Sequence, residues 1–259
     1  MQRAQEPAAA VGQPRPAEAS EPTDVEFRSD MTVELVRAAA SDADVIFGAR
    51  VSTKGEQSLA DVGADPAGAR GLIGYLMRER HGSPFEHTSM TFYVQAPIFV
   101  FREFMRHRTA SYNEESGRYR QLRPVFYVPG PDRDLVQHGK PGRYDFGPGT
   151  PEQSALVDQT VRRACTQAYA AYQEMLAAGV AREVARIVLP LTIYSSMYVT
   201  MNARALMNFL SLRTKRPDAR FPSYPQREIE MVAEAIEAEW ARLMPLTHEA
   251  FETNGRVAP

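Results

Sequence analysis

Hydrophobic residues recur at two spacings along the chain, and each spacing indicates a different kind of element. Residues Thr88–Gln95 read TSMTFYVQ, in which apolar and polar side chains alternate as they do in a half-buried β-strand. Residues Gly71–Arg80 instead place Leu72, Tyr75 and Leu76 on one side of a helical turn, which predicts an amphipathic helix. Gly82 and Pro84, in the sequence HGSPFEH, separate the helix from the strand because both oppose helix continuation.

The same two patterns predict a chain of mixed helices and strands. Further strands are expected at Thr32–Arg37, Val125–Val128 and Tyr194–Thr200. Further helices are expected at Asp42–Ala49, with Ser41 or Asp42 as N-cap, and at Ile98–Arg108, Pro151–Ala178, Ala181–Val188, Asn202–Leu212 and Gln226–Met244. Because strands and helices do not alternate in a regular βαβ rhythm, the pattern favours an α+β fold over a doubly wound sheet.

Two segments lack these patterns. Residues 1–30 are rich in Ala, Pro and Glu and bury too little apolar surface to offset the entropy of ordering, so we expect a disordered tail. Residues 129–150 contain many Pro and Gly and are expected to form an irregular loop. No linker divides the remainder, which predicts one domain over residues 31–259.

Composition narrows the class of protein. The chain has 259 residues, of which 44% are hydrophobic and 24% charged, as in ordinary globular proteins. The formal net charge of −2 gives the molecule as a whole no attraction for nucleic acid or an anionic membrane. No apolar run approaches the roughly 18 to 20 residues that span a bilayer, and the N-terminus lacks a secretory core, which favours a cytoplasmic protein. The single cysteine, Cys165, is interpreted as a core thiol.

One segment breaks this near-neutral balance. Between residues 101 and 123 there are six arginines, at 102, 106, 108, 118, 120 and 123, against three glutamates. The guanidinium group stays charged and binds phosphate or carboxylate through paired hydrogen bonds, so a cluster suits an anionic ligand. The tripeptide Ser116-Gly117-Arg118 adds backbone donors that could form an anion-binding nest. The alternative is a surface cluster in which, for example, Glu103 pairs with Arg106.

Motifs for other chemistries are missing from the sequence. There is no HExxH, CxxC, GxSxG, Walker-type or GxGxxG motif, and no two of the five histidines are spaced i,i+4. Metal catalysis is therefore not expected.

The densest motif in the chain resembles a known family. Arg106–Tyr119 reads RHRTASYNEESGRY, which matches the RHRxxSxNExSxRY motif of flavin-dependent thymidylate synthases. Segments similar to the same family occur at 49–52 (ARVS), 83–87 (SPFEH), 96–108 (APIFVFREFMRHR), 182–190 (REVARIVLP) and 202–213 (NARALMNFLSLR). The resemblance covers about residues 32 to 252, so a chance motif match is excluded.

The resemblance implies an activity, its cofactors and an assembly. Members convert deoxyuridine monophosphate (dUMP) to dTMP, with methylenetetrahydrofolate as carbon donor, FAD as redox carrier and NADPH as reductant. It also implies helices around a mainly antiparallel sheet, and a homotetramer whose active sites combine residues of several subunits. Small-molecule substrates and no nucleic-acid or membrane partner are expected.

Matching positions of the family motif implies two sets of binding residues. Those expected to contact FAD are Ser52, Ser83, Glu86, Arg106, His107, Arg108, Glu114, Asn202, Arg204 and Asn208. Those expected to contact dUMP are Glu103, Phe104, Met105, Arg106, Glu114, Glu115, Ser116, Gly117, Arg118, Arg186 and Arg213. Arg204 and Asn208, like Arg182 and Arg186, are spaced i,i+4 and could share a helix face, whether toward a ligand or toward solvent.

Two residues receive specific roles from the resemblance. Arg213 matches the arginine at the pyrimidine edge, where a fixed positive charge favours ionisation at N3, and it is the expected catalytic residue. Ser116 matches a serine once considered a nucleophile, but no base is evident beside it, so we assign it to substrate binding. Lys215 and Arg216 stand where relatives often have a flavin-contacting histidine.

A function of a different class uses the same segment. A single-stranded nucleic-acid-binding module could use residues 106–126, with Tyr112, Tyr119 and Phe126 as stacking platforms. The near-zero net charge and the scatter of the remaining arginines favour the enzyme.

Overall fold

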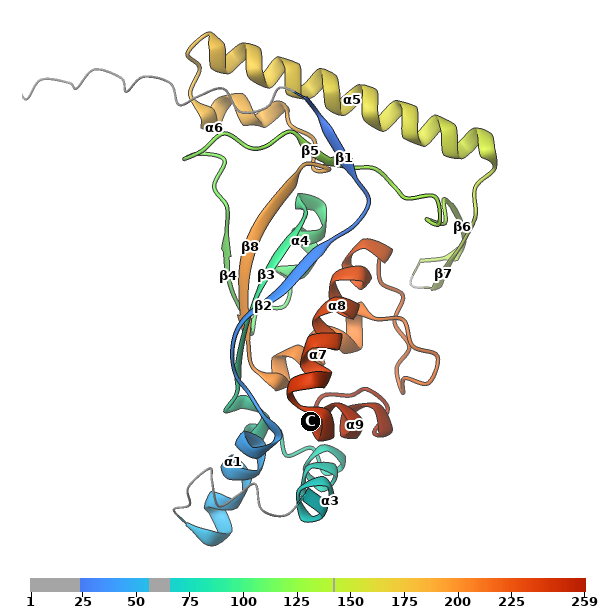
Figure 1. Cartoon of the computed structure of the whole chain (residues 1–259). Helices are drawn as coiled ribbons and strands as arrows, with labels where there is room; N and C mark the ends of the chain where they lie inside the picture. Colours follow the sequence, from blue (N-terminus) through green and yellow to red (C-terminus); the bar gives the residue numbers. More distant parts are fainter. Residues whose placement is uncertain (1–23, 56–65, 142) are drawn as a thin grey trace, which may run out of the picture.

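A four-stranded sheet forms the centre of the molecule. The computed structural model describes residues 24–55, 66–141 and 143–259. The strands are β2 (Thr32–Ala39), β3 (Ser89–Pro97), β8 (Tyr194–Met201) and β4 (Ser111–Glu114), in the order β2-β3-β8-β4, and each neighbouring pair is antiparallel. The predicted α+β class with a mainly antiparallel sheet is confirmed (Figure 1).

The alternation seen in the sequence produces a buried face on this sheet. In β3, Met90, Phe92 and Val94 are fully buried, and the residues between them are not. Helices α7 (Ala203–Arg213) and α8 (Arg227–Leu243) lie beside the sheet (Figure 1), and their apolar residues belong to the same core. The main core therefore lies between the sheet and the C-terminal half of the chain.

Helices α1 (Asp42–Lys54), α3 (Pro66–Arg78) and α9 (Pro245–Thr253) gather at one end of the molecule (Figure 1). Ser41 is the N-cap of α1, since its hydroxyl accepts a hydrogen bond from the amide of Asp44. The alternative N-cap, Asp42, has another role. Its carboxylate accepts hydrogen bonds from the Leu246 and Thr247 amides at the start of α9.

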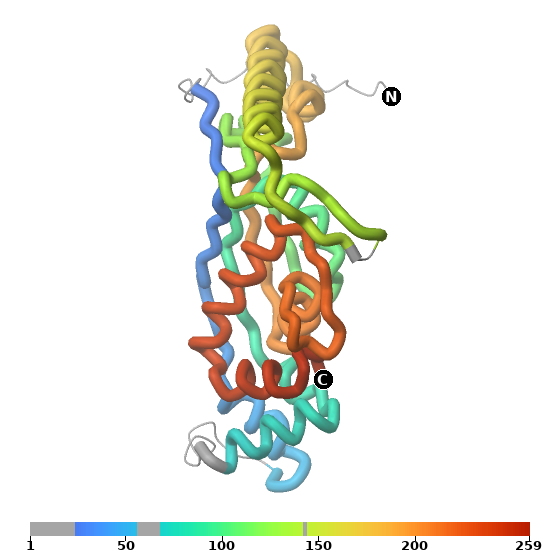
Figure 2. Tube along the Cα trace, turned by 90° about the vertical axis from the view of Figure 1, so that its right-hand side faces the viewer, coloured from blue at the N-terminus to red at the C-terminus, as the bar shows by residue number. Residues whose placement is uncertain are grey.

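The long helix α5 (Pro151–Ala177) lies at the opposite end (Figure 2). It covers a second, smaller core that includes Phe126 of β5 (Val125–Tyr127) and Cys165. The Cys165 sulfur lies 3.3 Å from the Thr192 hydroxyl, and burial raises the pKa of this thiol. The interpretation of Cys165 as a core residue is confirmed.

Several predicted boundaries were wrong. The tail was predicted to reach residue 30, but β1 (Glu26–Arg28) pairs in parallel with β5; residues 1–23 lie outside the described residues. The loop predicted at 129–150 contains an antiparallel pair, β6 (Val136–Lys140) and β7 (Arg143–Gly147). Strands β1, β6 and β7 are short and mostly polar, so no local apolar period indicates them.

Helices near the arginine-rich segment were also misjudged. The helix predicted at Ile98–Arg108 is α4 (Ile98–Phe104) and ends earlier, where the Tyr112 hydroxyl lies 2.9 Å and 2.8 Å from the carbonyl oxygens of Phe104 and His107. The helix predicted at 181–188 is divided into α6 (Arg182–Ala185) and a 3₁₀ turn, η2 (Arg186–Val188). Strand β4 and helix α9 were not predicted at all.

Other helices agree in place but differ in length. α1 continues to Lys54, and α3 begins at Pro66 and ends at Arg78, followed by a 3₁₀ turn, η1 (Ser83–Glu86). Within the described ranges, no helix is both long and apolar enough to cross a membrane.

Candidate functional site

Arg213, the expected catalytic residue, is held by two residues of the arginine-rich segment. It ends α7, and its Nη1 lies 2.7 Å from Glu103 Oε2 while its Nε donates to His107 Nε2 at 3.0 Å. A further Nη2 contact, 3.4 Å long, reaches the Glu103 carbonyl oxygen. The guanidinium plane is thus fixed by acceptors that lie more than 100 positions away in sequence.

Burial and charge keep the His107 ring neutral. The pKa of His107 is lowered to about 4, first because burial disfavours the charged ring and second because Arg213 is positively charged. The ring packs edge-on against Phe209, with centroids 4.9 Å apart. A neutral ring whose Nε2 accepts from Arg213 carries its proton on Nδ1.

The residues next to His107 point elsewhere. Arg106 and Arg108 are exposed, and neither side chain forms an ion pair with another described residue. Glu103 pairs with Arg213, so the surface pair that we considered between Glu103 and Arg106 is wrong. Two free guanidinium groups beside a held histidine suit binding of an anionic cofactor.

Two residues expected to contact dUMP differ in availability. The Phe104 side chain is buried and stacks on Phe209, with centroids 4.4 Å apart, so the side chain itself is not open to a ligand. The next residue, Met105, is 38% exposed.

A second group joins the loop after β4 to Arg186. A methyl group added at Gly117 would lie 3.3 Å from the Arg186 side chain and 3.0 Å from Leu122, so the loop backbone at Gly117 lies close to both side chains. The Arg118 amide donates to the Ser116 hydroxyl at 3.3 Å. One backbone donor of the predicted nest is therefore already bonded within the tripeptide. Arg118 itself pairs at the surface with Glu183.

Two glutamates border this group. Burial raises the pKa of Glu114, while the positive charge of Arg186 opposes the shift. Glu115 accepts from Ser196 of β8 at 3.2 Å and pairs with Arg120 at 3.1 Å. The predicted dUMP residues Glu114 to Arg118 and Arg186 are therefore neighbours, although they come from distant parts of the chain.

A third group surrounds the start of α7. Arg204 pairs with Glu86 at 2.5 Å, and its Nε donates to the Pro259 carbonyl oxygen at 2.7 Å. Its guanidinium also lies against Gly82, where an added methyl group would approach within 2.6 Å. Asn202 caps α7 by accepting from the Ala205 amide at 2.8 Å, and Asn208, one turn beyond Arg204, is exposed.

Ser52 and Ser83, both expected to contact FAD, line one cavity of about 720 Å³ between α1, α3 and η1. Its wall also includes Tyr75, His81 and His87, which the sequence motif did not identify. Its volume is in the range of small-molecule sites, about 300–1,000 Å³. The stacking of Tyr75 on His81, with ring centroids 5.7 Å apart, could have been found only from the fold.

Lys215 and Arg216 do not point toward the Arg213 group. Lys215 lies 3.6 Å from Asp145 of β7, and Arg216 lies 3.7 Å from Glu234 and 3.6 Å from Glu237 of α8. In the part of the chain that the structure describes, no ion pair or hydrogen bond joins either side chain to a residue expected to bind FAD.

No hydrogen bond or ion pair between described residues joins the Arg213 group to the Ser116–Arg186 group. The residues expected to contact dUMP are thus divided between these two groups within one chain.

Comparison with known proteins identifies the family. A sequence model described as "Thymidylate synthase complementing protein" matches residues 34–246, which is most of the chain. The chain is 68% identical over 236 residues to a flavin-dependent thymidylate synthase of Streptomyces coelicolor, covering 91% of this chain and 96% of that protein. A flavin-dependent thymidylate synthase of Tropheryma whipplei is 61% identical, with 90% and 97% covered.

The chain belongs to the flavin-dependent thymidylate synthase family. The resemblance seen in the sequence is confirmed, as is the prediction of an enzyme. Among solved structures, a UMP/dUMP methylase, PolB of Streptomyces cacaoi, was crystallised with 5-Br dUMP. It is 58% identical, with a TM-score of 0.86, and the match covers 91% of this chain and all of that one. None of these relatives is described as a nucleic-acid-binding module, so the alternative function gains no support.

Proposed function

We propose that this family member converts dUMP to dTMP with methylenetetrahydrofolate as carbon donor, FAD as redox carrier and NADPH as reductant. The single observation that carries the proposal is the Arg213 group. The arginine at the expected catalytic position is held by Glu103 and His107, both of the family-like segment 96–108, in a chain 68% identical to a flavin-dependent thymidylate synthase.

The residues present fit a flavin dinucleotide. The cavity lined by Ser52 and Ser83 combines apolar walls with polar groups, and Arg106 and Arg108 supply free guanidinium donors. We assign this region to FAD, together with His107, Glu86, Glu114, Asn202, Arg204 and Asn208. When bound, FAD supplies the redox chemistry, and the protein supplies orientation and electrostatics.

The nucleotide is assigned to the two remaining groups. Arg186 and the Ser116–Arg118 loop suit the phosphate, and Arg213 suits the edge of the pyrimidine. A positive charge at that edge stabilises a ring that loses the N3 proton, which makes C5 more nucleophilic. Among the described residues, no carboxylate or imidazole hydrogen-bonds the Ser116 hydroxyl, which supports a binding role.

An assembled site is part of the proposal. Exposed apolar residues flank Arg186, namely Val184, Ile187, Val188 and Leu191, with Ile187 74% exposed. We infer a homotetramer in which these surfaces meet and the separate groups of different subunits complete one site. A cytoplasmic location remains a prediction.

The test is direct. Purified protein should be yellow, or become so with FAD, and should release tritium from C5 of labelled dUMP when methylenetetrahydrofolate and NADPH are present. The visible spectrum during anaerobic NADPH reduction, with and without dUMP, tests cofactor and substrate together. A colourless protein that does not bind added FAD would contradict the proposal.

A second substrate is favoured by one comparison. The same relative, PolB, is described as a UMP/dUMP methylase and was also crystallised with 5-Br UMP; that structure is 56% identical to this chain, with a TM-score of 0.84. Tritium release from labelled UMP, measured beside dUMP, would show whether the ribonucleotide is used here too.

A further inference from the structure

The turn after α9 has an unusual backbone. The Arg256 amide donates to the Phe251 carbonyl and the Gly255 amide to the Glu252 carbonyl, which closes the helix. Gly255 has φ 76°, and Arg256 has φ 58°, in the left-handed region that disfavours residues with a side chain. Such a conformation persists where surrounding contacts hold it.

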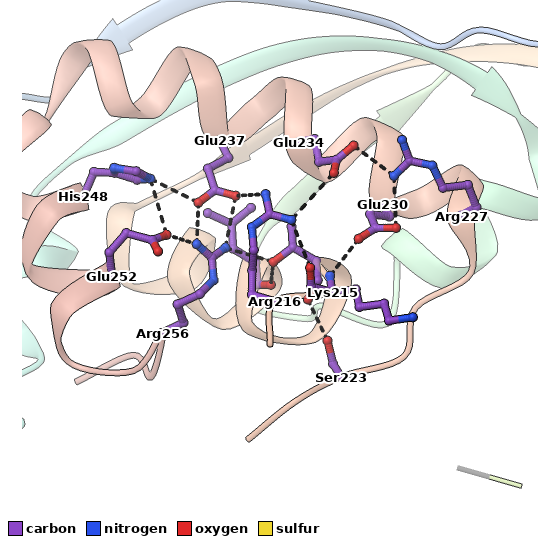
Figure 3. Close-up of polar contacts among 12 residues, drawn as sticks. Lys215, Arg216, Ser223, Arg227, Glu230, Glu234, Glu237, His248, Glu252 and Arg256 are labelled. Atoms are coloured by element: carbon purple, nitrogen blue, oxygen red, sulfur yellow. Dashed lines mark hydrogen bonds and ion pairs between the residues drawn. The ribbon is translucent and has the colours of Figure 1, made fainter. Parts of the chain in front are cut away.

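Those contacts are made by the Arg256 side chain, which is buried with 4% exposure. Its Nη1 lies 2.7 Å and its Nη2 3.0 Å from the two carboxylate oxygens of Glu237, in a paired arrangement, and Nη1 also contacts Glu252 (Figure 3). Nη2 donates a further hydrogen bond, 2.9 Å long, to the Thr214 hydroxyl.

Thr214 directly follows Arg213 and is itself buried. Its hydroxyl donates to the Leu210 carbonyl in the last turn of α7 at 2.7 Å, and its own carbonyl accepts from Ser223 at 2.8 Å. The next amide, that of Lys215, donates to Glu230 at 2.7 Å (Figure 3). The backbone that leaves Arg213 is therefore fixed by side chains from α8, from the loop before it and from the C-terminal turn.

The neighbours of Arg256 lie close enough together to hold a metal ion, but the Arg256 guanidinium already occupies the position beside them. Glu237, His248 and Glu252 could each offer one ligand atom. Arg256 Nη1 contacts both Glu237 and Glu252, so the guanidinium already supplies a positive charge between the two carboxylates. Burial alone would raise the pKa of Glu237, yet hydrogen bonds and charge from His248 and Arg256 hold it below its usual value.

We propose that Arg256 is a positioning residue, which sets the last turn of α7 through Thr214 so that Arg213 meets Glu103 and His107. The inference rests on the proposed role of Arg213. Residue 256 lies outside residues 34–246 that the family model matches.

The test uses two nearly isosteric substitutions. Thr214→Val removes the hydroxyl that accepts from Arg256, and Thr214→Ser retains it. Thr253→Val is the matched control, because it removes a threonine hydroxyl bonded to the Glu249 carbonyl in α9, away from Arg213. All variants are measured as full-length protein with FAD bound.

The decisive measurement is the pKa of N3 in bound 5-bromo-dUMP. The halogen makes N3 more acidic, and loss of the N3 proton changes the ultraviolet absorbance of the ring. In the unaltered protein the pKa of the bound nucleotide should lie below that of the free nucleotide. Thr214→Val should raise the bound pKa by about one unit and lower kcat about tenfold, with KM for dUMP and FAD affinity unchanged. Thr214→Ser and Thr253→Val should behave like the unaltered protein.

Equal bound pKa and kcat in the Val and Ser variants would overturn the positioning role. If Thr214→Val melts at a much lower temperature, Arg256→Lys is used in its place, since lysine keeps the charge but loses the paired guanidinium donors that reach Thr214. The same rise in the pKa of the bound nucleotide is expected, and its absence overturns the proposal. If Arg213→Ala leaves the bound pKa unchanged, the role of Arg213 itself fails. This failure of the proposed function differs from failure of the positioning role. In the first case Arg213→Ala leaves the pKa of bound 5-bromo-dUMP unchanged, and in the second Arg213→Ala changes that pKa but Thr214→Val does not.

Discussion

The Arg213 group and the Ser116–Arg186 group belong to one proposed site, but they are held very differently. Arg213 is fixed by Glu103 and His107 within its own chain, and its side chain is only 17% exposed. Arg186 lies against Gly117, beside apolar residues that are open to solvent. The comparison indicates that Arg213 is held in place within the single chain. We expect the proposed phosphate end, around Arg186, to gain its order from a ligand or from a partner subunit.

Removal of the fixed charge should have the largest effect. We expect Arg213→Ala to lower kcat by about 10²–10³-fold, because a preorganised electrostatic partner of the reacting ring is lost. FAD binding, followed by the visible spectrum, should change little. Arg213→Lys should recover part of the rate, since it restores charge without the fork. Turnover unchanged by Arg213→Ala would refute the assigned role.

Disturbing the open surface should act through assembly. Ile187→Asp places a charge on the apolar surface and should convert the protein to smaller species in sedimentation, with loss of most turnover. Leu156→Asp is the matched control, because Leu156 is 65% exposed near the other end of α5. Leu156 lies in the second turn of α5, whereas Ile187 lies in η2, so the two substitutions alter different surfaces. If Ile187→Asp keeps the same sedimentation coefficient, this surface is not an interface.

A smaller effect is expected at the phosphate loop. Ser116→Ala should raise KM for dUMP about tenfold, equivalent to about 1.4 kcal/mol and typical of a lost hydrogen bond to a charged group, with kcat reduced only a few-fold. Steady-state kinetics with varied dUMP separates the two constants. Normal dUMP binding with complete loss of chemistry would instead indicate a covalent role for Ser116.

The last prediction concerns stability and pH rather than turnover. Since the pKa of His107 is about 4 in the folded protein against 6.5 for a free histidine, the unfolded chain binds more protons between these values. Stability should therefore fall as pH decreases from 6.5 toward 4, and a protonated ring would also repel Arg213. His107→Gln keeps an acceptor without the titration, so melting temperatures across this range should fall less steeply. Parallel curves for the two proteins would show that another group titrates.

The sequence predicted those parts of the fold that have a local cause. Ser41 caps α1, as one of the two predicted alternatives, and the alternation in β3 corresponds to its buried face. The dense motif Arg106–Tyr119 includes His107, which accepts a hydrogen bond from Arg213, while the role of the motif in ligand binding stays a prediction. These features depend on residues close together in the chain.

Features that depend on distant partners were missed. Strand β4 reads SYNE and exists because β8 pairs with it, and α9 begins where Asp42, some 200 residues earlier, accepts its first amides. The pairing of Glu103 with Arg213 replaced the local pair that helical spacing favours. His81 and Tyr75 entered the cavity description only through the packing of α1, α3 and η1.

Cys165 has a practical consequence. It is the only cysteine in the chain, it is buried, and its raised pKa disfavours the reactive thiolate. Lys215, by contrast, has a side chain 58% exposed, on the loop that follows Arg213. A Lys215→Cys variant would thus accept a nitroxide or fluorophore at one place without prior removal of the native thiol. In the proposed tetramer, distances between the probes would report how the loops of neighbouring subunits approach each other during turnover.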